Sequence, residues 1–141
     1  MSRSDPDFSG RSVLWLDQGW QPAYIGFCPS KKAWRREMKR LGVTGQDYPD
    51  APGNTSTYES KGKFCIIVSL NEKAASAEGA TDLQVAGLLC HEAVHVWQFV
   101  KKNMGVFGDV DWETEAYSVQ AIFQNIYRAH LDVQKHRAKG T

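Results

Sequence analysis

One continuous helical segment dominates the middle of this chain. The run from Leu83 to Lys102 contains no proline, and Thr81 and Gln84 at its start have the spacing of a capping box. Its apolar residues recur every three or four positions and form one stripe. They are Leu83, Ala86, Leu89, Cys90, Ala93, Val94, Trp97 and Val100. The sequence therefore predicts an amphipathic helix over 83–102 whose stripe faces the core, with Cys90 as core filling rather than a metal ligand.

Two histidines lie four positions apart within this helix, in the pattern His-Glu-Ala-Val-His at residues 91–95. A helix advances about 100° and 1.5 Å per residue, so His91 and His95 share a face, where their ring nitrogens can converge on one metal ion. Glu92 lies close enough to reach a water on that ion without being a ligand. Alternatively, the two histidines merely belong to the polar face of the helix. The complete pattern favours zinc binding.

A catalytic zinc ion needs a third protein ligand, and Glu113 and Glu115 are the downstream candidates. They lie in a second predicted helix, from Trp112 to about Lys135. On the helical wheel, the apolar residues of this helix form one face that lies within about 60° of Glu115. It carries Trp112, Val119, Ile122, Ile126 and Val133. Glu113 lies about 160° away, on the expected solvent side. Since a buried carboxylate is costly unless it is paired or bound to metal, we expect Glu115 to be the ligand. The alternative is an Arg or Lys partner for Glu115.

This arrangement resembles a known family. The sequence HEAVH, then nineteen residues, then Glu115 followed by Ala116 is similar to the gluzincin group of zinc metallopeptidases over residues 83–126. In that group the third ligand is a Glu on the helix after the HExxH helix. The resemblance implies a zinc-dependent peptidase with Zn²⁺ held by His91, His95 and Glu115. Glu92 would be the general base that takes a proton from the attacking water.

The chain also departs from the pattern of this family. Some relatives carry an Asp four residues after the Glu ligand, and this chain has Val119 there. Support for the histidines would then come from elsewhere, with Asp109 and Asp111 as candidates. No residue is assigned as the donor to the oxyanion. The candidates that remain are Tyr24, Tyr58 and Tyr127.

The remaining segments indicate an α+β fold of zincin type, with a small antiparallel sheet covering the helical pair. We expect a hairpin of strands 13–16 and 23–28 joined through residues 17–19, a helix 30–41 with Ser30 as N-cap, a long loop 43–62, a strand 63–70 and a helix-prone linker 72–78. In zincins a strand just before the active-site helix offers its edge to an extended substrate. The strand 63–70 has that place in the sequence.

Length and composition fit one domain over 12–141 after a loose segment 1–11. The chain has 141 residues, of which 42% are hydrophobic. Three cysteines without CxxC spacing and the absence of a long apolar run predict a cytoplasmic protein that does not enter a membrane. The expected partner is a protein or peptide substrate. Oligomeric state is left open by the sequence.

Charge suggests one alternative function. The net charge is only +1, but segment 31–40 carries six Lys or Arg residues and one Glu. This basic helix could serve a nucleic-acid-associated protein, but we favour a solvated helix face, because the total charge is near neutral and the sequence has no nucleic-acid-binding signature. Another alternative is a catalytically inert zincin fold that binds a partner and keeps zinc for structure. Structural zinc sites usually have four protein ligands, and this chain offers three good ones, which favours the peptidase.

Overall fold

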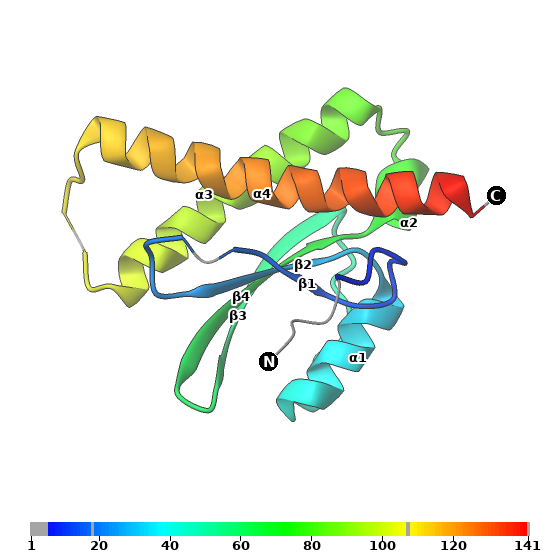
Figure 1. Ribbon diagram of the computed structural model, residues 1–141, viewed down its shortest axis with the longest axis horizontal. Coiled ribbons are helices and arrows are strands. Elements are labelled where there is room, and N and C mark those ends of the chain that lie inside the picture. Colours follow the sequence, from blue (N-terminus) through cyan, green and yellow to red (C-terminus); the bar gives the residue numbers. More distant parts are fainter. Residues whose placement is uncertain (1–5, 18, 107, 141) are drawn as a thin grey trace.

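A β-sheet separates two helical layers in this protein. The structure, a computed structural model, describes residues 6–17, 19–106 and 108–140. Over these residues the elements are β1 (Leu14–Trp15), β2 (Tyr24–Cys28), α1 (Lys31–Leu41), β3 (Gly53–Ser60), β4 (Lys63–Leu70), α2 (Glu72–Ala77), α3 (Asp82–Asn103) and α4 (Trp112–Lys139). Helices α3 and α4 cover one face of the sheet, and α1 lies on the other (Figure 1). The predicted α+β class is confirmed.

The sheet is mixed rather than antiparallel, which corrects the prediction. Its strand order is β1-β2-β4-β3, with β2 parallel to β4 and the other two pairings antiparallel. Between β2 and β4 the chain runs through α1 and then β3, and the β3–β4 hairpin reverses it, so that β4 has the same direction as β2. A crossover of this kind is what a parallel pair requires. Strand β4 is therefore central, and β3 forms the edge that was expected of segment 63–70.

Strand β3 lies in the segment that was predicted to be a loop over 43–62, so that prediction is wrong for its second half. The sequence of β3 is polar, and Gly, Asn and Ser residues in it are typical of loops. The segment is nevertheless a strand, because all eight residues of β3 pair with β4. A tight turn at Lys61 and Gly62, both with positive φ, connects the two strands.

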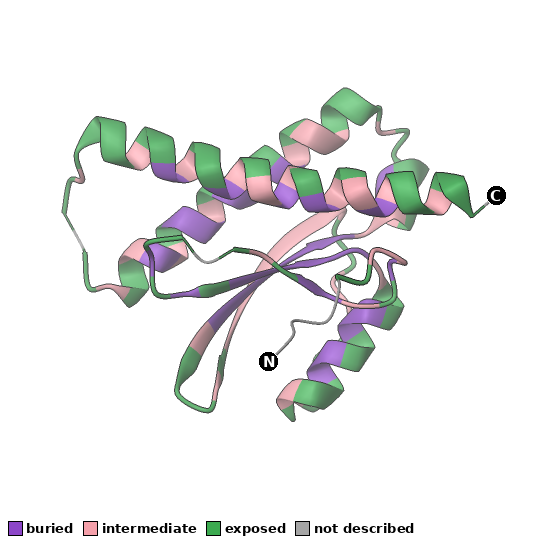
Figure 2. Cartoon of the chain, viewed as in Figure 1, coloured by how far each residue is buried: buried purple, intermediate pink, exposed green. Residues whose placement is uncertain are grey.

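Each face of the sheet has its own core. The larger core lies under α3 and α4 and includes Phe27, Ile66, Leu89 and Ile126. The smaller core joins the sheet to α1 and is centred on Trp34. Figure 2 shows that buried residues concentrate where the helices face the strands, while the β3–β4 turn is exposed. The larger core holds α3 across the sheet, and Gly53 and Thr55 of β3 lie against this helix.

Helix α3 confirms the predicted span, and its capping box is formed by Thr81 and Gln84. Its buried side differs from the predicted stripe, however, because Leu83 is 81% exposed and Cys90 and Val94 are also exposed. The side that faces the sheet carries Leu89, Glu92, Ala93, Val96, Trp97 and Val100. On a helical wheel with 100° per residue, the centre of this buried side lies roughly 60° from the centre of the predicted stripe. The rotation places Glu92 against the sheet.

Most other local predictions are confirmed. The strands β1 and β2 pair antiparallel, although residue 18 of their connection lies outside the described residues. Helix α1 begins after the N-cap Ser30 and ends at Gly42, which has φ 71°. Over the described residues 6–11 of the predicted loose segment there is no helix or strand. No helix in the described part of the chain combines the length and apolarity that a membrane span needs.

Helix α4 departs from its prediction at one end. Ile122, Ile126 and Val133 are buried as expected, but Trp112 is 87% exposed. Trp112 is the first residue of the helix, whose start extends past the sheet (Figure 1). A helical wheel does not show where a helix extends past the core.

Candidate metal centre

His91 and His95 bring their ring nitrogens together on α3. The Nε2 atoms are 3.1 Å apart and share a hydrogen bond, and the ring planes are inclined at 79°. Two nitrogens bound to a tetrahedral zinc ion at 2.0–2.1 Å are separated by about 3.3 Å. His91 is exposed and His95 is partly buried, so both rings can be reached from solvent. The pair therefore has almost the separation that two zinc ligands need.

Gln98 fixes the orientation of one of these rings. Its Oε1 lies 2.9 Å from His95 Nδ1, one helical turn further along α3. As an amide oxygen it can only accept a hydrogen bond, so Nδ1 carries the proton and Nε2 presents its lone pair. An oxygen acceptor on the other ring nitrogen is characteristic of metal-bound histidines.

Glu92 lies between α3 and the edge strand. Its side chain is among the few charged groups that are buried, with 5% of the residue exposed. The hydroxyl of Thr55 on β3 donates a hydrogen bond of 2.6 Å to Glu92 Oε2. Burial of a carboxylate is costly without such a partner. Thr55 thus determines where the Glu92 carboxylate points.

The close approach of β3 to α3 depends on a glycine. A Cβ atom at Gly53 would lie 2.9 Å from Cγ of Leu88 and 3.3 Å from Cγ of Glu92. Because glycine has no side chain, the first residue of β3 can lie directly against the helix. This contact brings Thr55, two residues later on the same side of the strand, to Glu92.

The predicted third ligand is not beside the histidines. Glu115 Oε2 accepts hydrogen bonds from Trp97 Nε1 at 2.9 Å and from Lys101 Nζ at 3.3 Å. Hydrogen bonds from Trp97 and then Lys101 lower the pKa of the Glu115 carboxyl from its usual value. The sequence predicted that Glu115 would lie on the buried face of α4. Its side chain is instead 44% exposed, so it lies at the rim of the α3–α4 contact. The Lys partner considered as the alternative for Glu115 is present.

The partners of Glu115 indicate how far it is from the histidines. Trp97 and Lys101 lie about 3 and 9 Å beyond His95 along α3, and on a side of the helix turned by about 120–160°. Within residues 6–17, 19–106 and 108–140, no three His, Cys, Asp or Glu side chains form a group that could hold a metal ion. The structure therefore brings two candidate zinc ligands together, His91 and His95, and places the third candidate, Glu115, elsewhere. Glu113 is exposed, as predicted.

Other residues singled out in the sequence have different surroundings from those expected or a role elsewhere in the fold. Cys90 is exposed, so its expected role as core filling is wrong. Tyr58 packs against Trp34 on the α1 side of the sheet, opposite α3. Asp111 is the N-cap of α4, where its Oδ2 accepts a hydrogen bond from the backbone N–H of Thr114. The six basic residues of α1 are exposed, and one of them, Arg40, pairs with Glu37.

Thr55, Gln98 and Gly53 were not identified from the sequence. Gln98 could have been found, because it lies three residues after His95 and so on the same side of the helix. The other two belong to β3, which the sequence did not predict as a strand.

Comparison of the chain with protein-family models, with curated proteins and with solved structures finds no match. The resemblance to gluzincins thus stays a prediction from the sequence motif.

Proposed function

We propose that this protein is a zinc-dependent peptidase whose metal ligands include His91 and His95 and whose general base is Glu92. The observation that carries the proposal is the 3.1 Å separation of the two Nε2 atoms, with Gln98 holding one ring in the tautomer that binds metal. A buried carboxylate on the residue that follows His91 supports it.

The zinc ion, Glu92 and Thr55 would each have a separate role in hydrolysis of the peptide bond. A bound zinc ion would make a water nucleophilic at neutral pH and polarise the carbonyl of the scissile bond. Thr55 binds Oε2 of Glu92 and leaves Oε1 to accept the proton of the attacking water. The same carboxyl can then donate this proton to the leaving amine. The contact with β3 limits the directions in which Glu92 can turn, which favours proton transfer.

Glu115 is our proposed third ligand, and this role requires a rearrangement. Its Oε2 would have to leave Trp97 and Lys101, and the first turns of α4 would have to move toward His95. The connection from α3 to α4 contains Gly105 with φ 75°, a backbone geometry that most other residues adopt only at a cost. Glu115 is a negative charge at the first turn of α4, where replacing it would also affect the helix.

The free edge of β3 suits an extended peptide. Residues of an antiparallel pair alternate between hydrogen-bonded and non-hydrogen-bonded positions. Pro52 O accepts a hydrogen bond from Asn71 N, and this register directs the backbone N–H and C=O groups of Thr55 and Thr57 away from β4. A substrate strand could add to these groups beside Glu92, as the resemblance to zincins implies.

The experiment compares the wild-type protein with Glu92→Gln on a pool of denatured proteins. New peptide termini are counted by mass spectrometry with and without a chelator. We expect chelator-sensitive cleavage by the wild type, and at least a hundredfold less by Glu92→Gln at equal zinc content. Glu113→Gln, on the exposed side of α4, is the matched control and should cleave normally.

Two results would contradict the proposal. Cleavage that persists in Glu92→Gln would remove Glu92 from the mechanism. A zinc-loaded wild-type protein that produces no new termini would favour the inert zincin-fold binding protein.

A further inference from the structure

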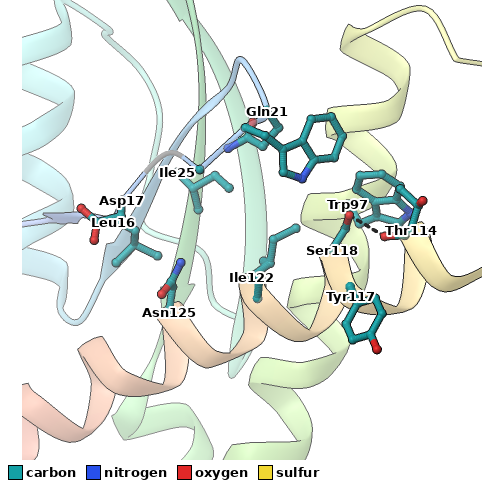
Figure 3. A pocket seen from close by; sticks show the side chains of 13 residues that line it. Leu16, Asp17, Gln21, Ile25, Trp97, Thr114, Tyr117, Ser118, Ile122 and Asn125 are labelled. Carbon is teal, nitrogen blue, oxygen red and sulfur yellow. Dashed lines mark hydrogen bonds between the residues drawn. The ribbon is translucent and has the colours of Figure 1, made fainter.

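A cavity of about 420 Å³ lies on the other side of α4 from the rim where Glu115 meets α3. It is bounded by the β1–β2 connection, by β2 and by one face of α4 (Figure 3). The residues of α4 that line it include Ser118, Ile122 and Asn125, which share one side of the helix. Its size is in the range of small-molecule sites.

The walls of this cavity are mainly apolar and aromatic. Ile25 and Ile122 form part of the floor, and Trp20 and Trp97 meet edge to face with ring centroids 6.3 Å apart. Trp20 is 65% exposed although it lines a cavity, so much of its indole surface is available to a ligand. Aromatic faces attract both apolar groups and cations.

Charge in the cavity has one sign. Asp17 is the only charged residue among the described residues that line it, and it forms no ion pair with any of them or with the rest of the described chain. Asp17 and Asn125 lie at the same end of the cavity, away from Trp97 (Figure 3). Lys101 Nζ already lies 6.0 Å from the centre of the Trp97 ring, which leaves the indole of Trp20 for a ligand. A carboxylate, an amide and this indole favour a positively charged group, and among the described residues no Lys, Arg or His lines the cavity to attract an anion.

We propose that this cavity binds a small organic cation, an amine with an aromatic or alkyl body. The body would lie on Ile25, Ile122 and the indole of Trp20, and the ammonium group would face Asp17 and Asn125. The proposal does not rest on the proposed peptidase activity, because His91, Glu92, His95 and Glu115 do not line the cavity. One residue joins the two regions, since Trp97 lines the cavity and donates a hydrogen bond to Glu115.

Tryptamine tests the proposal against two compounds of nearly the same shape, the neutral tryptophol and the anionic indole-3-propionate. Binding to the full chain is measured by titration calorimetry at low ionic strength. We expect tryptamine to bind about fivefold more tightly than tryptophol, from an exposed ion pair and a cation–π contact together. Indole-3-propionate should bind more weakly than both.

Substitutions then locate the site. Ala121→Trp fills the cavity from an exposed position on α4 and should abolish binding of tryptamine. Asp17→Asn should remove most of the preference for tryptamine over tryptophol, whereas Asp47→Asn, at an exposed position outside the cavity, should leave it unchanged. The proposal is overturned if no compound binds, if the anion binds most tightly, or if Ala121→Trp binds tryptamine like the wild type. Because Ala121→Trp could disturb the fold, Trp20→Ala serves as a second variant and should weaken binding severalfold.

Discussion

The hydroxyl of Thr55 donates a hydrogen bond of 2.6 Å to Glu92 Oε2, and this contact joins the edge strand to the helix that carries both histidines. It links the stability of the β3–α3 contact to the geometry of the proposed general base. The first prediction follows from it.

Thr55→Val should lower the free energy of unfolding by about 1–3 kcal/mol, because it leaves a buried carboxylate without its donor. Thr55→Ser keeps the hydroxyl and should restore most of that loss. Urea denaturation of the two variants and the wild type measures the difference. A Val variant as stable as the wild type, together with a loss in the Ser variant, would show that the methyl group matters and the hydrogen bond does not.

Gly53→Ala should destabilise the protein by about 1 kcal/mol, since the new Cβ would lie 2.9 Å from Leu88 Cγ and push β3 from α3. Gly87→Ala is the matched control. Gly87 lies inside α3 with nothing within 4 Å of an added Cβ, so this variant should gain about 0.5–1 kcal/mol. Thermal unfolding should therefore move in opposite directions, and a stabilising Gly53→Ala would refute the close approach.

Lys101→Met should tighten zinc binding by about twofold to fivefold, the range of an exposed ion pair, if Glu115 must leave Lys101 to become a ligand. Lys102→Met, at the neighbouring exposed position, should not change it. Competition with a fluorescent zinc chelator gives both affinities. If Glu115→Gln binds zinc with the same affinity as the wild type, Glu115 is not a ligand. If Glu115→Gln weakens binding and Lys101→Met has no effect, Glu115 is a ligand that Lys101 does not restrain.

His130 should make stability depend on pH. Its Nδ1 is buried without a hydrogen-bond partner in the described structure, and burial lowers the pKa of the imidazole from 6.5. Glu72 and Asp82 oppose this shift and Arg137 adds to it. The folded state therefore binds fewer protons than the unfolded chain as pH falls below about 6.5, and stability decreases until the lower, folded pKa is reached.

His130→Phe should remove this part of the pH dependence and keep the ring packed against Phe27. The free energy of unfolding is measured between pH 5 and 8, by roughly half-unit steps. His136→Phe, near the exposed end of α4, is the control and should keep the wild-type slope. An unchanged slope in His130→Phe would assign the pH dependence to other groups.

Elements with strong local signals could be predicted from the sequence. The capping box at Thr81, the N-cap Ser30 and the left-handed Gly42 each depend on neighbouring residues, and the structure has helices that begin and end there. The convergence of His91 and His95 is local as well, since one helical turn fixes it. Such features do not require knowledge of the tertiary fold.

Features that depend on distant partners could not be predicted. Strand β3 gains its hydrogen bonds from β4, so its polar sequence resembled a loop. The buried side of α3 is set by the sheet beneath it, which buries Glu92 and leaves Leu83 exposed. The position of Glu115 depends on how α4 slides along α3, and the periodicity of one helix contains no information about that displacement.

Metal content tests the central claim most directly. The protein is dialysed against buffered zinc and analysed by elemental mass spectrometry, alongside His91→Ala and His95→Ala. We predict about one zinc ion per chain in the wild type and almost none in either variant. A wild-type protein that retains no zinc, or His variants that retain as much as the wild type, would contradict the account.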